Sequence, residues 1–236
     1  MSLELMTRTR SHDISGFGVF SQGDAGEAHV TAHRMLDEGR HELGHRLLGA
    51  WLQWHDGAGS DWTHLQWHMA VFEIAVGKWE AALARFEREI LPVARKSDDA
   101  LTDAPAMLWR LWLAAPRAVE LPWEPVRDAA VRNLGRHVGP YVELHCLLAL
   151  AGAKDIEGLD QWLRIKRHCG DRRTRILAQL AVGLRAFAAA DYELAAAALT
   201  EVRDRVAELG GSHAQNQLFE QIAEESWERA RFRAVA

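Results

Sequence analysis

A pattern that recurs about every 38 residues is the strongest constraint on how this 236-residue chain can fold. Its clearest copy starts at Gly77, which is followed by Trp79, Ala82 and Phe86. In an antiparallel pair of helices, a small residue permits a tight turn, an alanine lets the helices approach closely, and large residues fill the space between them. The segment 77–86 therefore predicts a helix–turn–helix unit.

The same frame occurs at three further places in the sequence. It starts at Gly39, Ala153 and Ala190, and each start is preceded seven residues earlier by a small side chain, namely Ala32, Cys146 and Gly183. A further turn is expected near Ala115. Repeats at near-constant spacing are typical of stacked helix pairs, in which each unit buries its apolar face against the next.

The pattern predicts an all-α protein, a tetratricopeptide-like right-handed helical-repeat solenoid of about five helix pairs with a C-terminal capping helix. The units are expected near 26–55, 62–95, 103–136, 140–168 and 174–209, and the capping helix at 212–232, with Ser212 as its N-cap. The helices expected within these units are 26–38, 40–55, 62–76, 79–95, 103–114, 124–136, 140–151, 156–168, 174–189 and 192–209. Residues 1–25 are expected to form an N-terminal arm and 26–236 a single domain.

Several segments resemble the tetratricopeptide repeat protein 38-like family. They are 28–33, 38–40, 64–72, 108–111, 210–215 and 218–221, of which the most specific is Gly-Gly-Ser-His-Ala-Gln at 210–215. The resemblance covers roughly 26–226 and corresponds to the C-terminal part of longer family members. Asn216 and Gln217 depart from it, because the family tends to have an Arg-Asp pair there. The resemblance implies a helical-repeat scaffold and no defined chemistry.

Charge and composition exclude several classes of partner. The chain has 28 Lys and Arg against 33 Asp and Glu, a net charge of −5, so no basic excess favours nucleic acid. No apolar run is long enough to span a membrane, and the first residues lack the apolar core of a signal peptide. The two cysteines, Cys146 and Cys169, form no CxxC motif or disulfide framework. We therefore expect a cytoplasmic protein with no nucleic-acid or membrane partner.

Histidine gives the clearest functional signal, because twelve occur in the chain. His29 and His33 are four residues apart on one expected helix, and His64 and His68 are four apart on the first helix of the next unit. Residues at this spacing share a helix face. In a tetratricopeptide-like unit these first helices line the concave groove. A pair of imidazoles four residues apart also has the geometry to bind one metal ion.

The groove positions define a set of candidate ligand-binding residues, namely His29, His33, His64, Trp67, His68, His145 and His213. Trp67 lies between two of the histidines, where its ring either stacks on a ligand or packs against the neighbouring unit. The histidines themselves have an alternative role as buried side chains that bond to neighbouring helices. Glu73 is a candidate for orienting a ligand histidine, and Asp103 is expected to be the N-cap of its helix.

The leading hypothesis from the sequence is a non-enzymatic scaffold, without a cofactor, that binds a peptide, a protein segment or a small polar ligand in its concave groove. The alternative is a metal-binding protein or an enzyme that uses the groove histidine cluster. A third hypothesis is self-association, as in a homodimer. No catalytic residue is predicted, because the sequence contains no nucleophile elbow, P-loop or dinucleotide-binding fingerprint.

Overall fold

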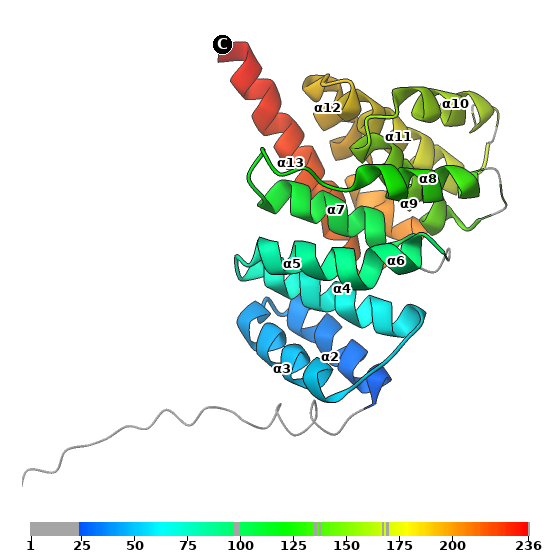
Figure 1. The fold of residues 1–236 in the computed structure, drawn as a ribbon. Helices are drawn as coiled ribbons and strands as arrows, with labels where there is room; N and C mark the ends of the chain where they lie inside the picture. Colours follow the sequence, from blue (N-terminus) through cyan, green and yellow to red (C-terminus); the bar gives the residue numbers. More distant parts are fainter. Residues whose placement is uncertain are drawn as a thin grey trace, which may run out of the picture.

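The protein is all-α, as predicted. The structure, a computed structural model, describes residues 24–96, 100–134, 136, 138–166, 168 and 170–235, and within these it contains helices and no strand (Figure 1). Residues 1–23 of the expected arm and Cys169 lie outside the described residues. Asp24 and Ala25 were expected in the arm but belong to the first helix, because the Asp24 carboxylate caps its N-terminus by accepting from the Glu27 amide at 2.9 Å.

The helices lie close to the expected positions. They are α2 (Ala25–Asp37), α3 (His41–Trp54), α4 (Ser60–Ala75), α5 (Trp79–Arg85), α6 (Leu91–Ala94), α7 (Asp103–Ala114), α8 (Trp123–Leu134), α9 (Pro140–Gly152), α10 (Ile156–Lys166), α11 (Arg172–Ala188), α12 (Tyr192–Val202) and α13 (His213–Val235). Most boundaries agree with the expected ones to within about two residues, which is the precision with which helix ends are defined.

Two of the expected helices are irregular inside. The helix expected at 79–95 contains a π-helical turn, η1 (Phe86–Ile90), between α5 and α6. Pro92 lies two residues after this turn and has no amide hydrogen to donate back along the helix, which favours a local change of hydrogen-bond pattern. The helix expected at 192–209 ends at Val202 and continues as a 3-10 helix, η2 (Arg203–Leu209).

Four of the turns between paired helices have the same geometry. Gly39, Gly77, Lys154 and Ala190 each adopt a left-handed backbone conformation, with φ between 57° and 79°. At each of them the following amide donates to the carbonyl five residues before it, as from Arg40 to Met35 at 2.8 Å. This pair of features is the Schellman motif, which ends a helix cleanly. The third turn therefore lies at Lys154, one residue after the expected position.

Helices that open successive pairs also contact one another. α2 packs against α4, α4 against α7, α7 against α9, and α9 against α11, while each also packs against the helix that follows it. The apolar core therefore continues through the molecule as three adjoining clusters, around Phe72, Phe86 and Leu180. None of the helices in the described part of the chain is long and apolar enough to span a membrane.

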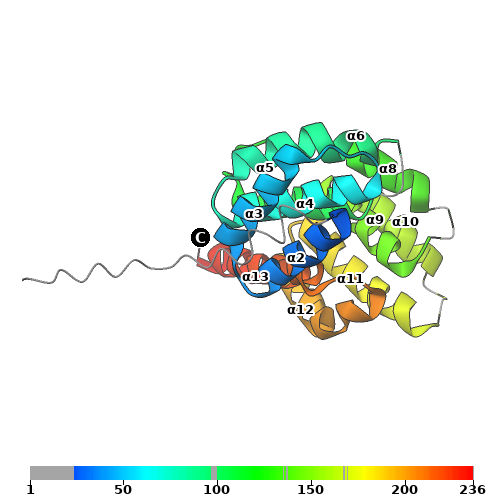
Figure 2. The same cartoon turned by 90° about the horizontal axis from the view of Figure 1, so that it is seen from below.

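The last helix, α13, caps the helix series as expected and also contacts helices from its other end. α13 packs along α12, as a capping helix should, and lies beside α2 (Figure 2). It also contacts α7. Its N-terminus is a capping box, in which the Ser212 amide donates to the Gln215 side chain and the Gln215 amide donates to the Ser212 hydroxyl. The predicted N-cap at Ser212 is therefore confirmed, and α13 links the two ends of the helix series.

Candidate metal centre

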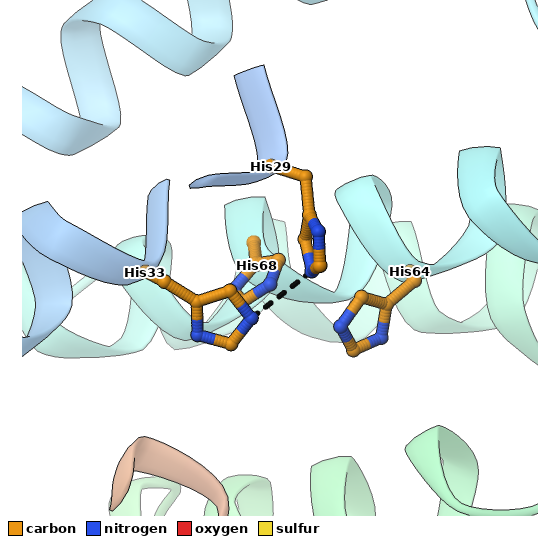
Figure 3. A group of neighbouring side chains, drawn as sticks. All are labelled: His29, His33, His64 and His68. Carbon is orange, nitrogen blue, oxygen red and sulfur yellow. Dashed lines mark hydrogen bonds between the residues drawn. The ribbon is translucent and has the colours of Figure 1, made fainter. Parts of the chain in front are cut away.

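Two packed helices, α2 and α4, bring four histidines together. His29 and His33 lie one turn apart on α2, and His64 and His68 lie one turn apart on α4. The two pairs face one another across the helix contact (Figure 3). One ring nitrogen from each histidine lies within 4.8 Å of those of the other three. We call these four residues the histidine cluster.

Most ring pairs of the histidine cluster pack edge to face, and the remaining pairs, His29–His68 and His33–His64, are tilted. The Nε2 atoms of His29 and His33 are 3.0 Å apart, which is a hydrogen-bond distance when one of them carries a proton. The ring centroids of His33 and His68 are 4.3 Å apart, and those of His64 and His68 are 4.7 Å apart. All four imidazoles can therefore reach one small ion with little movement.

His68 lies at the base of the cluster and is fully buried. Neither of its ring nitrogens has a hydrogen-bond partner among the described residues. Burying a polar group without a partner costs free energy, so most buried polar groups in proteins are paired. The other three histidines are partly exposed, which leaves the cluster open to solvent on one side.

A carboxylate from a third helix fixes one of the imidazoles. Both carboxylate oxygens of Asp103, which is buried at the start of α7, lie 3.0 Å from Nδ1 of His64. Nδ1–H therefore donates to Asp103, and the lone pair of Nε2 remains available to a ligand. The expectation that Asp103 is an N-cap is wrong, because Thr102 occupies that position and Asp103 begins the helix itself.

Burial and mutual repulsion keep most of the cluster neutral. Burial, followed by the charges of neighbouring histidines, lowers the pKa of His29 and His33 and lowers the pKa of His68 well below its usual value. Burial also acts to lower the pKa of His64, but the hydrogen bond and the charge of Asp103 outweigh it and the pKa is raised. Imidazole must be deprotonated to bind a metal, so the lowered pKa values of His29, His33 and His68 favour ligation, and a metal would have to displace the proton that the raised pKa of His64 favours.

Trp67 does not face an open groove. It is fully buried, and its ring lies parallel to that of His64 with centroids 5.5 Å apart. Its burial supports the packing interpretation of this residue rather than exposed stacking on a ligand. Trp67 therefore packs against two rings of the histidine cluster, those of His64 and His68.

Three further candidates lie apart from the cluster. His145 is buried on α9, where Nδ1 donates to the Tyr141 carbonyl at 2.8 Å, and burial lowers its pKa to about 4. His213 begins α13, and its Nε2 accepts from the Gln217 amide at 3.2 Å. Glu73 orients no histidine; it pairs instead with the Arg85 guanidinium at 2.7 Å.

Arg110 is a residue beside the cluster that the sequence analysis did not single out. It lies on α7, only 7% exposed, with its guanidinium 5.3 Å from the centre of the Trp67 ring. It donates to the carbonyls of Ala106 and Ala214, and burial lowers its pKa to about 10. The available signal was a lone charge in the apolar run 104–115.

Comparison with known proteins identifies no family for this chain. No family model matches it, and no solved structure matches it. The site is therefore interpreted from its own geometry and chemistry.

Proposed function

We propose that the protein binds one transition-metal ion through His29, His33, His64 and His68. The observation that carries the proposal is the convergence of four imidazole nitrogens, from two helices, to within 4.8 Å of one another. Four nitrogen ligands suit Zn²⁺, which prefers a tetrahedron with bonds of about 2.0–2.1 Å. In such a tetrahedron the nitrogens lie about 3.3 Å apart, so side-chain adjustments of roughly an ångström close the site.

The chemistry of the surroundings supports this proposal. A bound ion would give a partner to a buried ring nitrogen of His68, which has none among the residues that the structure describes. Asp103 holds His64 with Nε2 directed away from the carboxylate, which is the arrangement found around metal-bound histidines. Asp103 also places a negative charge next to a doubly charged ion.

We infer a structural role for the ion, with no enzymatic activity. Four protein ligands leave no open position on a tetrahedral Zn²⁺, and closed sites of this kind stabilise folds. The ion would join α2, the first helix that the structure describes, to α4 and through Asp103 to α7. Binding free energy would then contribute directly to folding free energy.

The test is unfolding of the full chain in the presence of Zn²⁺ and of a chelator. An ion that binds only the native state raises the free energy of unfolding by about 4 kcal/mol at a free concentration 1,000 times its dissociation constant. The double variant His64→Ala, His68→Ala should lose this response.

A matched control comes from α3, where His41 and His45 are also four residues apart but lie outside the cluster. The variant His41→Ala, His45→Ala should respond to Zn²⁺ as the wild type does. An equal response of the wild type and the His64→Ala, His68→Ala variant would refute the proposal.

We also infer that the helix pairs form a tetratricopeptide-like solenoid that acts as a binding scaffold. The four equivalent turns and the successive contacts between first helices support this arrangement. Membership of the tetratricopeptide repeat protein 38-like family remains a proposal that rests on the segments quoted above. Because α13 contacts α7 and α2, a ligand on the inner face would bind beside this helix.

A further inference from the structure

A pocket of about 510 Å³ lies between α13 and the C-terminal ends of α2, α4 and α7. Apolar side chains form one wall, namely Leu36, Val71, Ile74, Leu113 and Ala114. The facing wall belongs to α13 and carries Gln217, Gln221, Glu224, Glu225 and Glu228, of which Glu225 pairs with Arg117 and Arg229. The pocket is therefore an apolar space bordered by polar groups along one helix.

Arg110 provides a cation in the wall of this pocket. Its two recorded hydrogen bonds go to the uncharged carbonyls of Ala106 and Ala214. No ion pair joins it to any carboxylate of the described residues, and Asp103 acts on it only from beyond salt-bridge distance. A buried charge without a counter-ion is costly, and an anion that reached it would relieve that cost.

Two neighbouring donors also lack acceptors. Nε1 of Trp67, whose ring lies under the Arg110 guanidinium, has no hydrogen-bond partner among the described residues. The same holds for the buried hydroxyl of Tyr141. Neither side chain lines the pocket, so a ligand that brings acceptor oxygens into it would meet the Arg110 guanidinium as its charged donor.

We propose that this pocket binds a monocarboxylate with a short aliphatic body. The carboxylate would accept from Arg110, and the aliphatic chain would pack on the wall formed by Leu36, Val71 and Ile74. Glu224 and Glu228 form no ion pair with a described residue and would repel a second carboxylate. The site would therefore discriminate against dicarboxylates. The proposal is independent of metal binding by the histidine cluster.

Calorimetric titration of the full chain with hexanoate tests the proposal. We expect saturable binding with a dissociation constant of about 1 mM or lower. Butanoate should bind more weakly, by about fourfold for each methylene removed. Hexanamide, which lacks the charge, and hexanedioate, which carries two, should each bind at least about tenfold more weakly than hexanoate.

Variants locate the site. Arg110→Gln should abolish hexanoate binding, and because Arg110 is buried this variant needs a check of its helical content. Ala114→Trp, at an exposed position in the pocket wall, should block binding without disturbing the core. Ala197→Trp, at an exposed position on α12, is the matched control and should bind normally.

The titration is repeated with Zn²⁺ and with a chelator, so that failure of the metal proposal and failure of this one are separate results. Absence of saturation by hexanoate at about 10 mM would overturn the proposal. Equal binding of hexanoate and hexanamide would overturn the role of the carboxylate, and normal binding by Ala114→Trp would place the ligand elsewhere.

Discussion

The α2–α4 contact and the α9–α11 contact are built in the same way from different side chains. Each joins the first helices of two successive pairs, and each of these helices ends at a left-handed turn residue: Gly39 and Gly77 in one case, Lys154 and Ala190 in the other. Counted back from these turns, the equivalents of His29 and His33 are Leu144 and Leu148, and the equivalents of His64 and His68 are Leu177 and Ala181. All four equivalents are buried in the apolar core.

The comparison shows that helix stacking in this protein does not need imidazoles. Leucine and alanine fill the α9–α11 contact with ordinary apolar packing, which stabilises the fold without polar groups to satisfy. The α2–α4 contact uses four polar rings instead, and within the described part of the chain neither ring nitrogen of His68 has a hydrogen-bond partner. Burying these nitrogens costs free energy, and a ligand bound by the imidazoles would offset that cost.

The largest expected effect comes from replacing histidines of the α2–α4 contact with the equivalent side chains of the α9–α11 contact. The triple variant His29→Leu, His33→Leu, His68→Ala introduces the side chains of α9 and α11 and keeps the His64–Asp103 pair. We expect the metal-free protein to be more stable by about 1–3 kcal/mol, because apolar groups replace the partly exposed rings of His29 and His33 and the buried ring of His68, which has no hydrogen-bond partner among the described residues. Denaturant unfolding measures this change.

The same variant should lose the whole stabilisation by Zn²⁺, about 4 kcal/mol at a free concentration roughly 1,000 times the dissociation constant of the wild type. If the triple variant is less stable than the metal-free wild type, the histidines pack better than the comparison implies. If it still responds to Zn²⁺, the ion binds elsewhere.

A smaller effect is expected from Asp103→Asn. The substitution keeps the size of the side chain but removes the charge that holds Nδ1–H of His64. Loss of such a positioning partner typically weakens metal binding by about 10–100-fold. A competition titration with a chromophoric chelator measures the affinity.

Asp61 gives a matched control for this substitution, since its charge acts on His29 and His64 without a hydrogen bond to either. Asp61→Asn should weaken binding less than Asp103→Asn. Equal effects of the two substitutions would contradict a positioning role for Asp103.

The metal-free protein should also lose stability in mild acid. The pKa values of His29, His33 and His68 are lowered on folding, so the unfolded chain binds more protons than the native state below the unfolded pKa of about 6.5. Their contribution is complete above that pH and is lost as the pH falls, at up to about 1.4 kcal/mol per pH unit for each proton.

The raised pKa of His64 works in the opposite direction: its contribution is present at low pH and is lost as the pH rises through the folded pKa. The free energy of unfolding, measured at pH 5 and at pH 7.5, contains the contributions of all four histidines. We expect it to be smaller at pH 5. The triple variant should show a flatter profile, and identical profiles would contradict the assignment to these histidines.

The smallest expected effect concerns the left-handed turns that end the first helices of both contacts. Ala190 adopts φ 61°, a conformation that glycine occupies in the equivalent turns at Gly39 and Gly77. Ala190→Gly should raise the free energy of unfolding by up to about 1 kcal/mol, and Gly39→Ala should lower it by a similar amount. Thermal unfolding distinguishes the two, and a change of the same sign in both would mean that the turns are not equivalent.

The sequence predicted the helices and both histidine pairs because these depend on local spacing. The period of the small residues placed His29 and His33 on one helix and His64 and His68 on the next first helix. The role of Asp103 was missed because a buried carboxylate at the start of a helix looks like a cap. A usable signal was its distance of 39 residues from His64, about one repeat period, which places it on the neighbouring first helix.

Other features were beyond the reach of a repeat pattern. The contacts of α13 with α7 and α2, which create the pocket at Arg110, depend on how the whole series of helices curves. The π-helical turn before Pro92 and the 3-10 helix at Arg203–Leu209 depend on local hydrogen bonding. The contacts of α13 arise from tertiary packing, which overrides local helix propensity. The two irregular segments arise from local hydrogen bonds that the repeat spacing does not specify.

The most direct test of the central claim is X-ray absorption at the zinc edge on full-length protein loaded with one equivalent of Zn²⁺. The account predicts a single shell of four nitrogen atoms at about 2.0–2.1 Å, with the outer scattering of imidazole rings. The triple variant provides the reference, and the fourfold imidazole signal should be absent from it. A wild-type spectrum with fewer than four imidazoles, or one unchanged in the variant, would contradict a site shared by α2 and α4.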